Sequence, residues 1–229
     1  MAGDMKENFF TNSPKHTTET GDNIIFPFGP PIFQSELDYN FINDLIEQGN
    51  KLTVQKDDWR PKLAGQMKSG GSFSFKEVFK LKAEKYLMQY VNRFLDGHTQ
   101  QYGPRMIDRL LNVKGKRGRL KLDTFWINYQ HKHDYNPPHT HNGVLSFVIY
   151  CKVPKAIFTE NAVSNTQNAG QIVFMHGEEG HALLGASYPI KPYKGLFLLF
   201  PNNLVHHVPA FWIDEERISV SGNFEVVDK

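Results

Sequence analysis

The chain has 229 residues, a formal net charge of +2 and 40% hydrophobic residues, including 18 phenylalanines. These values predict a globular protein with a sizeable core, and the small charge gives no support for binding nucleic acid or a membrane surface. The single cysteine excludes an intramolecular disulfide framework and fits a reducing compartment. No stretch approaches the ~18 apolar residues of a membrane span, and no signal peptide is recognised. The expected location is therefore cytoplasmic.

The N-terminal part of the chain, residues 24–115, is predicted to be mainly helical support, after a polar and flexible tail over residues 1–23. A first amphipathic helix follows Ser35, which can cap it, and Gly49 is expected to end it. The apolar residues of this helix recur at three- and four-residue intervals: Leu37, Phe41, Ile42, Leu45 and Ile46.

A polar segment with several glycines, residues 51–74, separates the first helix from the next, and its composition makes it a candidate lid. A second helical pattern extends from Phe75 to about Gly103, again with apolar residues on one face. Both helices are expected to pack against a sheet.

Residues 116–229 consist of short β-rich runs separated by Gly, Pro and Asn, with no helical period between them. This pattern predicts an antiparallel sandwich or barrel, which forms one compact unit with residues 24–115. The predicted fold class is mainly β with an N-terminal helical layer. A basic run near residue 116 is interpreted as a solvated turn rather than a nucleic-acid contact: Lys114, Lys116, Arg117, Arg119 and Lys121.

Two histidines, His139 and His141, are separated by one residue and follow Pro137 and Pro138. Side chains at positions i and i+2 of a strand point to the same face, so both imidazoles could reach one ion. The prolines hold the approach to the pair extended. A histidine pair alone is weak evidence, since two polar residues in a loop give the same pattern.

A third histidine, His206, lies on a later predicted strand, and Arg217 and Ser219 follow on the last one. If these two strands pair as a hairpin, His206 and Arg217 face the same barrel interior. An arginine is costly to bury unless it meets an anion, and its planar fork suits a carboxylate. The alternative is that Arg217 ends a strand at the surface and pairs with Glu215 or Glu216.

The order and spacing of these motifs resemble those of the Fe(II)- and 2-oxoglutarate-dependent oxygenases, which carry H-x-D/E, a distal histidine and R-x-S. Within this superfamily the likeness is greatest to oxygenases of phages and marine bacteria, over about residues 120–225. The segments that carry it are Trp126-Ile-Asn128, His139-Thr-His141, Ser146-Phe-Val-Ile-Tyr150, Phe200-Pro-Asn-Asn-Leu-Val-His206-His-Val208 and Arg217-Ile-Ser-Val-Ser-Gly-Asn223.

The resemblance implies a double-stranded β-helix, also called a jelly-roll or cupin-like fold, with Fe(II), 2-oxoglutarate and O2 as cofactors. The implied reaction hydroxylates an unactivated C–H bond and releases succinate and CO2. The metal ligands would be His139, His141 and His206. The residues implied to hold 2-oxoglutarate are Arg217, on its distal carboxylate, together with Ser219, Tyr150 and Asn128.

The sequence departs from the family pattern at the middle ligand, where His141 stands in place of a carboxylate. A neutral imidazole contributes no negative charge, so the iron is left more positive than in the usual site of two histidines and one carboxylate. Asp134 could supply a carboxylate instead if its loop folds back. His131 and His133 form a second H-x-H motif, but they lie in a polar loop without a downstream partner.

Two other interpretations stay open. A cupin-type dioxygenase with three histidines and no 2-oxoglutarate explains the histidines but leaves Arg217 and Ser219 without a task. A non-catalytic β-sandwich binding protein would carry the histidines incidentally. The substrate, whether a small molecule or a peptide, and the oligomeric state are not readable from the sequence; nucleic acid and membrane partners are not expected.

Overall fold

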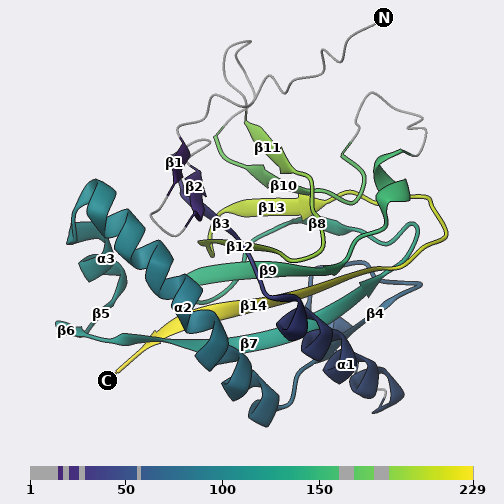
Figure 1. Cartoon of the computed structure of the whole chain (residues 1–229), viewed down its shortest axis with the longest axis horizontal. Helices are drawn as coiled ribbons and strands as arrows, with labels where there is room; N and C mark the ends of the chain where they lie inside the picture. Colours follow the sequence, from purple (N-terminus) through teal and green to yellow (C-terminus); the bar gives the residue numbers. More distant parts are fainter. Residues whose placement is uncertain are drawn as a thin grey trace, which may run out of the picture.

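The computed structural model describes residues 15–17, 21–25, 29–55, 58–159, 168–177 and 186–228. Two antiparallel sheets face each other, and helices cover the outer side of the larger one (Figure 1). This arrangement is a double-stranded β-helix and confirms the predicted fold class. None of the described helices combines the length and the apolar character that crossing a membrane requires.

The larger sheet has eight strands in the order β1-β2-β3-β12-β9-β14-β7-β4. Its strands are β1 (Lys15–Thr17), β2 (Asn23–Ile25), β3 (Ile32–Glu36), β12 (Leu196–Pro201), β9 (Leu145–Lys152), β14 (Arg217–Val227), β7 (Arg119–Gln130) and β4 (Gly71–Ser74). The smaller sheet has the order β11-β10-β13-β8. Its strands are β11 (Ser187–Ile190), β10 (Ile172–Met175), β13 (Val205–Val208) and β8 (Asn136–His139).

The chain before residue 115 contributes strands as well as helices. Strands β1 to β3 extend one edge of the larger sheet and β4 covers the other, so the backbone groups at both edges of the β-helix core find partners. Strand β1 lies within the segment expected to be a flexible tail, and its backbone pairs with β2. Most of that segment, residues 1–14 and 18–20, lies outside the described residues.

Helices α1 (Tyr39–Gln55) and α2 (Glu77–Tyr102) pack on the outer face of the larger sheet (Figure 1). The remaining helical elements are α3 (Arg105–Leu110), η1 (Arg60–Lys62) and η2 (Lys155–Phe158). A hairpin of β5 (Asn112–Val113) and β6 (Lys116–Arg117) carries the first three residues of the basic run, and the last two lie on β7. This hairpin turns at Lys114 and Gly115, both at positive φ, and its two strand residues Lys116 and Arg117 are exposed, consistent with a solvated turn.

Two sequence predictions about the first helix are wrong. Ser35 does not cap it, because Ser35 lies in β3 and its hydroxyl donates to the Asp22 carboxylate; the amide of Asn40 instead donates to the Asp38 side chain. Gly49 does not end the helix, which continues to Gln55. Gly49 is buried where α1 crosses β7, and a Cβ there would collide with the side chain of Ile127. The glycine therefore permits a close helix–sheet approach.

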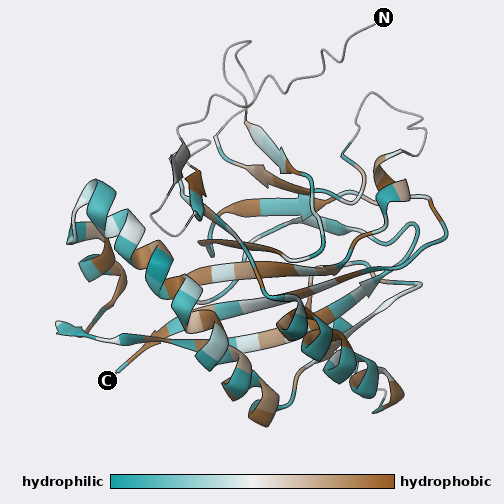
Figure 2. Ribbon diagram, viewed as in Figure 1, coloured by the Kyte–Doolittle hydropathy of each residue, from teal (hydrophilic) through white to brown (hydrophobic). Residues whose placement is uncertain are grey.

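The alternation of side chains along β9 explains the two cores. Phe147 and Ile149 point toward the helices and pack in the outer cluster with residues such as Leu45. Val148 and Tyr150 point the other way, into the space between the two sheets. Figure 2 shows apolar residues along these central strands and polar residues on the outward faces of the helices. A pocket lies between the two sheets.

Candidate active site

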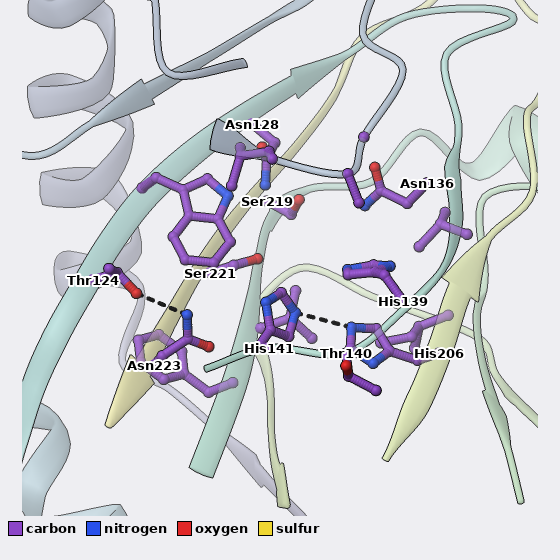
Figure 3. A pocket seen from close by; sticks show the side chains of 18 of the residues that line it. Thr124, Asn128, Asn136, His139, Thr140, His141, His206, Ser219, Ser221 and Asn223 are labelled. Carbon is purple, nitrogen blue, oxygen red and sulfur yellow. Dashed lines mark hydrogen bonds between the residues drawn. The ribbon is translucent and has the colours of Figure 1, made fainter. Parts of the chain in front are cut away.

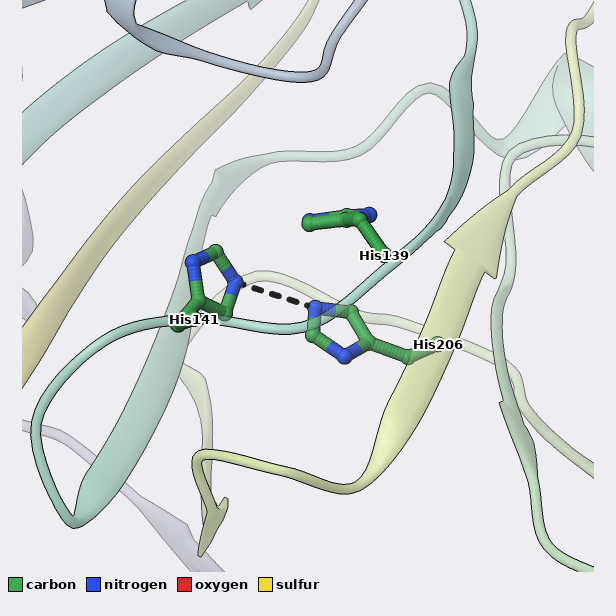
Figure 4. Close-up of side chains that lie close together, drawn as sticks. All are labelled: His139, His141 and His206. Atoms are coloured by element: carbon green, nitrogen blue, oxygen red, sulfur yellow. Dashed lines mark hydrogen bonds between the residues drawn. The ribbon is translucent and has the colours of Figure 1, made fainter.

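Three histidines meet where the smaller sheet faces the larger one (Figure 4). His139 ends β8 and His206 lies on β13, directly opposite it in the strand pairing. His141 follows two residues after His139. One ring nitrogen from each residue lies within 4.8 Å of the others, which is the spacing of a group that could hold a metal ion.

Local backbone carbonyls orient two of the three rings. The Nδ1 atom of His139 lies 2.7 Å from the carbonyl oxygen of Pro137, and the Nδ1 atom of His206 lies 2.9 Å from that of Leu204. Because a carbonyl only accepts, each Nδ1 carries the proton, and each Nε2 lone pair is left for a ligand. Fixing the tautomer in this way is the usual task of groups around a metal site.

His141 reaches the cluster in a different way from the one predicted. Strand β8 ends at His139, so His141 is not on the strand, and alternation does not set its direction. Asn202, in the turn after β12, holds the backbone of His141 on both sides: its carbonyl accepts from the His141 amide at 2.9 Å, and its side-chain amide donates to the His141 carbonyl at 2.8 Å. The loop is therefore fastened to the opposite sheet.

The chemistry of the three rings fits a metal ion. Burial lowers the pKa of His141 to about 4 and lowers the pKa of His139 and of His206 as well, so all three imidazoles are neutral at pH 7, the form that binds metals. The Nε2 atoms of His141 and His206 lie 3.2 Å apart. Both nitrogens could therefore reach one ion.

Asp134, the alternative carboxylate ligand, lies outside this cluster. The side chain is buried, and its oxygens accept from the amides of Ser69, Gly70 and His131. Three backbone donors fix the carboxylate away from the histidines. Its task is to fasten the segment before β4 to the turn after β7.

The other histidine pair does not join the cluster. The Nε2 atom of His131 lies 3.5 Å from the carboxylate of Glu216, and the ring of His133 lies edge-on to the ring of Trp212. His133 has a positive φ of 68°, which belongs to a turn rather than to a strand. The second H-x-H motif is therefore part of the loop that follows β7.

A second polar group, built around Arg217, lies in the same pocket. Arg217 is 3% exposed, and no carboxylate of the described residues forms an ion pair with it. Its Nη1 atom donates to Oε1 of Gln130 at 2.5 Å, while its Nε has no hydrogen-bond partner. The hydroxyl of Tyr150, whose ring lies 5.0 Å from the guanidinium carbon, is also buried without a partner. Burial lowers the pKa of Arg217, and the neighbouring Tyr150 side chain opposes only part of this shift.

Ser219 and Asn128 lie beside the arginine. They face each other across β14 and β7, and Tyr150 faces Ser219 from β9. The Oδ1 atom of Asn128 accepts from the Ser72 hydroxyl at 2.7 Å, so the NH2 group of Asn128 is the part left for another molecule. An anion placed here would find donors from several directions.

The prediction that β13 and β14 pair as a hairpin is wrong. They belong to different sheets, and His206 and Arg217 instead face the same pocket from opposite sides. The alternative placing of Arg217 at the surface is also excluded by its burial. The sequence therefore predicted that His206 and Arg217 share a pocket, but not that they reach it from two different sheets.

The pocket that joins both groups has a volume of about 350 Å³ (Figure 3). Residues Trp59 to Gly65 line part of its wall, so the segment named as a candidate lid borders the pocket. Arg60 fixes this segment by donating to the carbonyls of Met67 and Gly70, and Gln66 pairs with Tyr135. Part of the 51–74 segment belongs to other elements: residues 51–55 end α1 and residues 71–74 form β4.

Several residues that shape the site were missed by sequence reasoning. Gln130 accepts from Arg217 and donates from Nε2 to the Asp134 carbonyl at 2.7 Å. Asn202 fixes His141, and Ser72 fixes Asn128. A partial signal existed for Gln130, because it lies two residues beyond Asn128 on the same strand. Asn202 and Ser72 gave no signal, since they act through contacts distant in the sequence.

The fold and the site together place three histidines and a buried arginine in one pocket of a double-stranded β-helix. Residues 124–223, which are fewer than half of the 229 residues, match the family described as "Putative 2OG-Fe(II) oxygenase". This matched region includes the three histidines and Arg217, and it is similar to Fe(II)- and 2-oxoglutarate-dependent oxygenases, enzymes that use Fe(II), 2-oxoglutarate and O2. The match agrees with the family expected from the motifs.

Solved structures share the fold at low sequence identity. A prolyl-4-hydroxylase of Pseudomonas putida is 14% identical over 85% of this chain and 91% of its own, with a TM-score of 0.51. The viral collagen prolyl hydroxylase of Paramecium bursaria Chlorella virus-1, in a 2OG complex, is 12% identical over 86% and 96%, with a TM-score of 0.52. A Trichoplax adhaerens prolyl hydroxylase is 13% identical over 85% and 83%, with a TM-score of 0.50. No curated protein sequence matches the chain.

Proposed function

We propose that this oxygenase hydroxylates an unactivated C–H bond of its substrate and couples that reaction to the conversion of 2-oxoglutarate to succinate and CO2. The proposed iron ligands are His139, His141 and His206. The residues proposed to hold 2-oxoglutarate are Arg217, Ser219, Tyr150 and Asn128.

The observation that carries this assignment is the pair of unpartnered donors at the arginine end of the pocket. The Nε of Arg217 and the hydroxyl of Tyr150 are both buried without a hydrogen-bond partner. Leaving such groups unpaired costs about 1–3 kcal/mol each, and more for a charged group. A carboxylate of a bound dicarboxylate would satisfy both and would neutralise the buried guanidinium. A three-histidine enzyme without 2-oxoglutarate would leave that cost unrelieved.

The protein itself contributes position, charge and exclusion of water. The neutral imidazoles would hold the metal, and the backbone carbonyls of Pro137 and Leu204 orient the rings of His139 and His206 so that their Nε2 atoms are available for it. Arg217 would fix the far end of the cosubstrate, and the wall from Trp59 to Gly65 restricts access to the pocket. When bound, iron with 2-oxoglutarate and O2 supplies the oxidising power for hydroxylation.

Anaerobic titration of the protein with Fe(II) and 2-oxoglutarate tests the assignment through the metal-to-ligand charge-transfer band. Wild type should develop the band with one equivalent of each. Arg217→Ala should need at least tenfold more 2-oxoglutarate, because a charge-assisted bidentate contact is lost. Arg119→Ala, on the exposed part of β7, is the matched control and should behave as wild type. If wild type shows no band, the proposal fails.

The role of His141 needs its own test, because a carboxylate is usual at this position. His141→Ala should weaken Fe(II) binding by more than the roughly 10–100-fold that loss of an outer partner of a ligand costs. His133→Ala, in the other H-x-H motif, is the control and should leave iron affinity unchanged. Equal iron affinities of His141→Ala and wild type would remove His141 from the ligand set.

We further propose that the substrate is a small molecule or a peptide, and that the enzyme acts in the cytoplasm. A buried free thiol, Cys151, whose pKa burial raises to about 12, suits a reducing compartment and takes no part in the chemistry.

A further inference from the structure

The floor of the pocket is a regular grid of side chains from three neighbouring strands. Residues two apart on β14 face the pocket, and each has a partner on β7 and another on β9. The row nearest Arg217 holds Asn128, Ser219 and Tyr150. The middle row holds Trp126, Ser221 and Val148, and the far row holds Thr124, Asn223 and Ser146.

The far row is separated from the row nearest Arg217 by the middle row, which lies beside the histidine cluster. Asn223 lies four residues beyond Ser219 on the strand, which corresponds to roughly 13 Å. The ring of His141 lies 5.9 Å from that of Trp126, in the middle row. Both Thr124 and Asn223 line the same pocket as the histidines (Figure 3). A molecule that touches the far row would therefore lie beyond the middle row from Arg217, within the pocket that the histidines also line.

A chain of hydrogen bonds gives the far row a fixed polarity. The Ser146 hydroxyl donates to Oδ1 of Asn223 at 2.8 Å. Nδ2 of Asn223 in turn donates to Oγ1 of Thr124 at 2.7 Å (Figure 3). Because Thr124 already accepts from Asn223, its own proton is free to be donated. Among the described residues no acceptor receives it, so the Thr124 hydroxyl presents a donor to the pocket.

The charges near this row select the kind of acceptor. Asp123, which is exposed, lines the same end of the pocket, and the ammonium group of Lys62 lies over the ring of Trp59, 3.9 Å from its centre. No arginine or lysine belongs to the far row, and a carboxylate or phosphate bound there would be repelled by the neighbouring Asp123 carboxylate. A neutral acceptor suits this environment better than an anion.

We propose that the far row is a substrate subsite in which the Thr124 hydroxyl binds an amide carbonyl oxygen, and that Asn223 is the positioning residue that keeps Thr124 a donor. The substrate is then a peptide or another carboxamide. This inference rests on the proposed function, since the C–H bond to be hydroxylated must lie between this contact and the metal.

The test uses the anaerobic Fe(II)–2-oxoglutarate complex of the full chain. The probes are N-acetyl amino-acid N-methylamides covering the twenty side chains, and calorimetry measures the Kd of each. For every amide that binds, the analogue with a carbonyl reduced to CH2 is measured beside it. We expect at least one amide to bind and its reduced analogue to bind at least tenfold more weakly.

Two isosteric variants separate the roles of the two residues. Thr124→Val removes the donor, and Asn223→Asp reverses the polarity of the bond, because a carboxylate accepts the Thr124 proton. Each should weaken amide binding about tenfold, the worth of roughly one hydrogen bond left unmade. Thr124→Ser should retain wild-type affinity. Thr53→Val, an exposed position on α1, is the remote control.

The affinity for 2-oxoglutarate, measured on the same samples, distinguishes failure of this inference from failure of the proposed function. The Kd of 2-oxoglutarate should be the same in all variants, because the far row does not reach Arg217. If 2-oxoglutarate binds but no amide does, or if Thr124→Val binds amides like wild type, the subsite is overturned. If wild type does not bind 2-oxoglutarate, the proposed function falls and this inference with it.

Discussion

Gln130 is the only described side chain that accepts a hydrogen bond from the buried Arg217 guanidinium, and it is uncharged. A carboxylate at this position would pair with the arginine and compete with 2-oxoglutarate for its charge. A neutral amide orients the guanidinium and leaves its charge available. The same amide also donates to the Asp134 carbonyl, which a carboxylate could not do. We therefore predict that Gln130→Glu weakens 2-oxoglutarate binding.

The size of the effect follows from Coulomb's law. The introduced carboxylate and the distal carboxylate of 2-oxoglutarate would lie on either side of one guanidinium, about 6 Å apart. At an effective dielectric constant of about 20, two such charges repel by roughly 3 kcal/mol. A loss of about 3 kcal/mol corresponds to a roughly 100-fold higher Kd. Gln130→Met, which removes the hydrogen bond without adding charge, should cost only about 1 kcal/mol, or about fivefold.

The assay is anaerobic calorimetric titration of the Fe(II) protein with 2-oxoglutarate and, in parallel, with 2-oxopentanoate. The second ligand has the same 2-oxo acid group but lacks the distal carboxylate. Its Kd should be equal in wild type and Gln130→Glu. If wild type and Gln130→Glu bind 2-oxoglutarate with equal affinity, the predicted charge repulsion is refuted. It is also refuted if Gln130→Glu loses the same affinity for 2-oxopentanoate as for 2-oxoglutarate. Thermal unfolding of each variant checks that the loss of the Asp134 contact has not disrupted the fold.

Three further substitutions have predicted signs. Tyr150→Phe removes a buried hydroxyl without a partner, so the free energy of unfolding of the free protein should be unchanged or higher, while 2-oxoglutarate binding weakens about fivefold. Asp134→Ala leaves three backbone amides without their acceptor and should cost about 3 kcal/mol, lowering Tm by roughly 10 °C. Gly49→Ala should destabilise by about 1–3 kcal/mol through overpacking against β7, although alanine is the better helix former.

Calorimetric unfolding and ligand titration check these three. For Tyr150→Phe, a large loss of stability in the free protein would mean that the hydroxyl is paired after all. For Asp134→Ala, the iron affinity should match that of wild type when it is measured at a temperature where the variant is folded. If the affinity falls as far as in His141→Ala, Asp134 would have to be a metal ligand. A Gly49→Ala variant more stable than wild type would contradict the close approach of α1 to the sheet.

The sequence contained enough to predict the family, the fold class and the residues that share the pocket. His139, His206 and Arg217 are recognisable because the order and spacing of H-x-H, a distal histidine and R-x-S are themselves informative. Alternation along a strand also placed Ser219 on the side of Arg217. These are properties of the local sequence, which a single chain displays directly.

What could not be predicted depends on contacts between distant segments. The direction of His141 is set by Asn202, in the turn after β12, and not by the strand that ends at His139. The task of Asp134 depends on the amides of Ser69 and Gly70, more than sixty residues earlier. Gly49 looked like a helix end because the sequence does not show that β7 lies against it.

The bonds from His139 to the Pro137 carbonyl and from His206 to the Leu204 carbonyl have a consequence for how such a protein can diverge. In each case the group that orients the ring belongs to the main chain two residues earlier in the sequence. A main-chain carbonyl is present whatever side chain the residue carries, so no substitution at Leu204 can delete it. Side chains around these two histidines can therefore change without disturbing the orientation of the two rings.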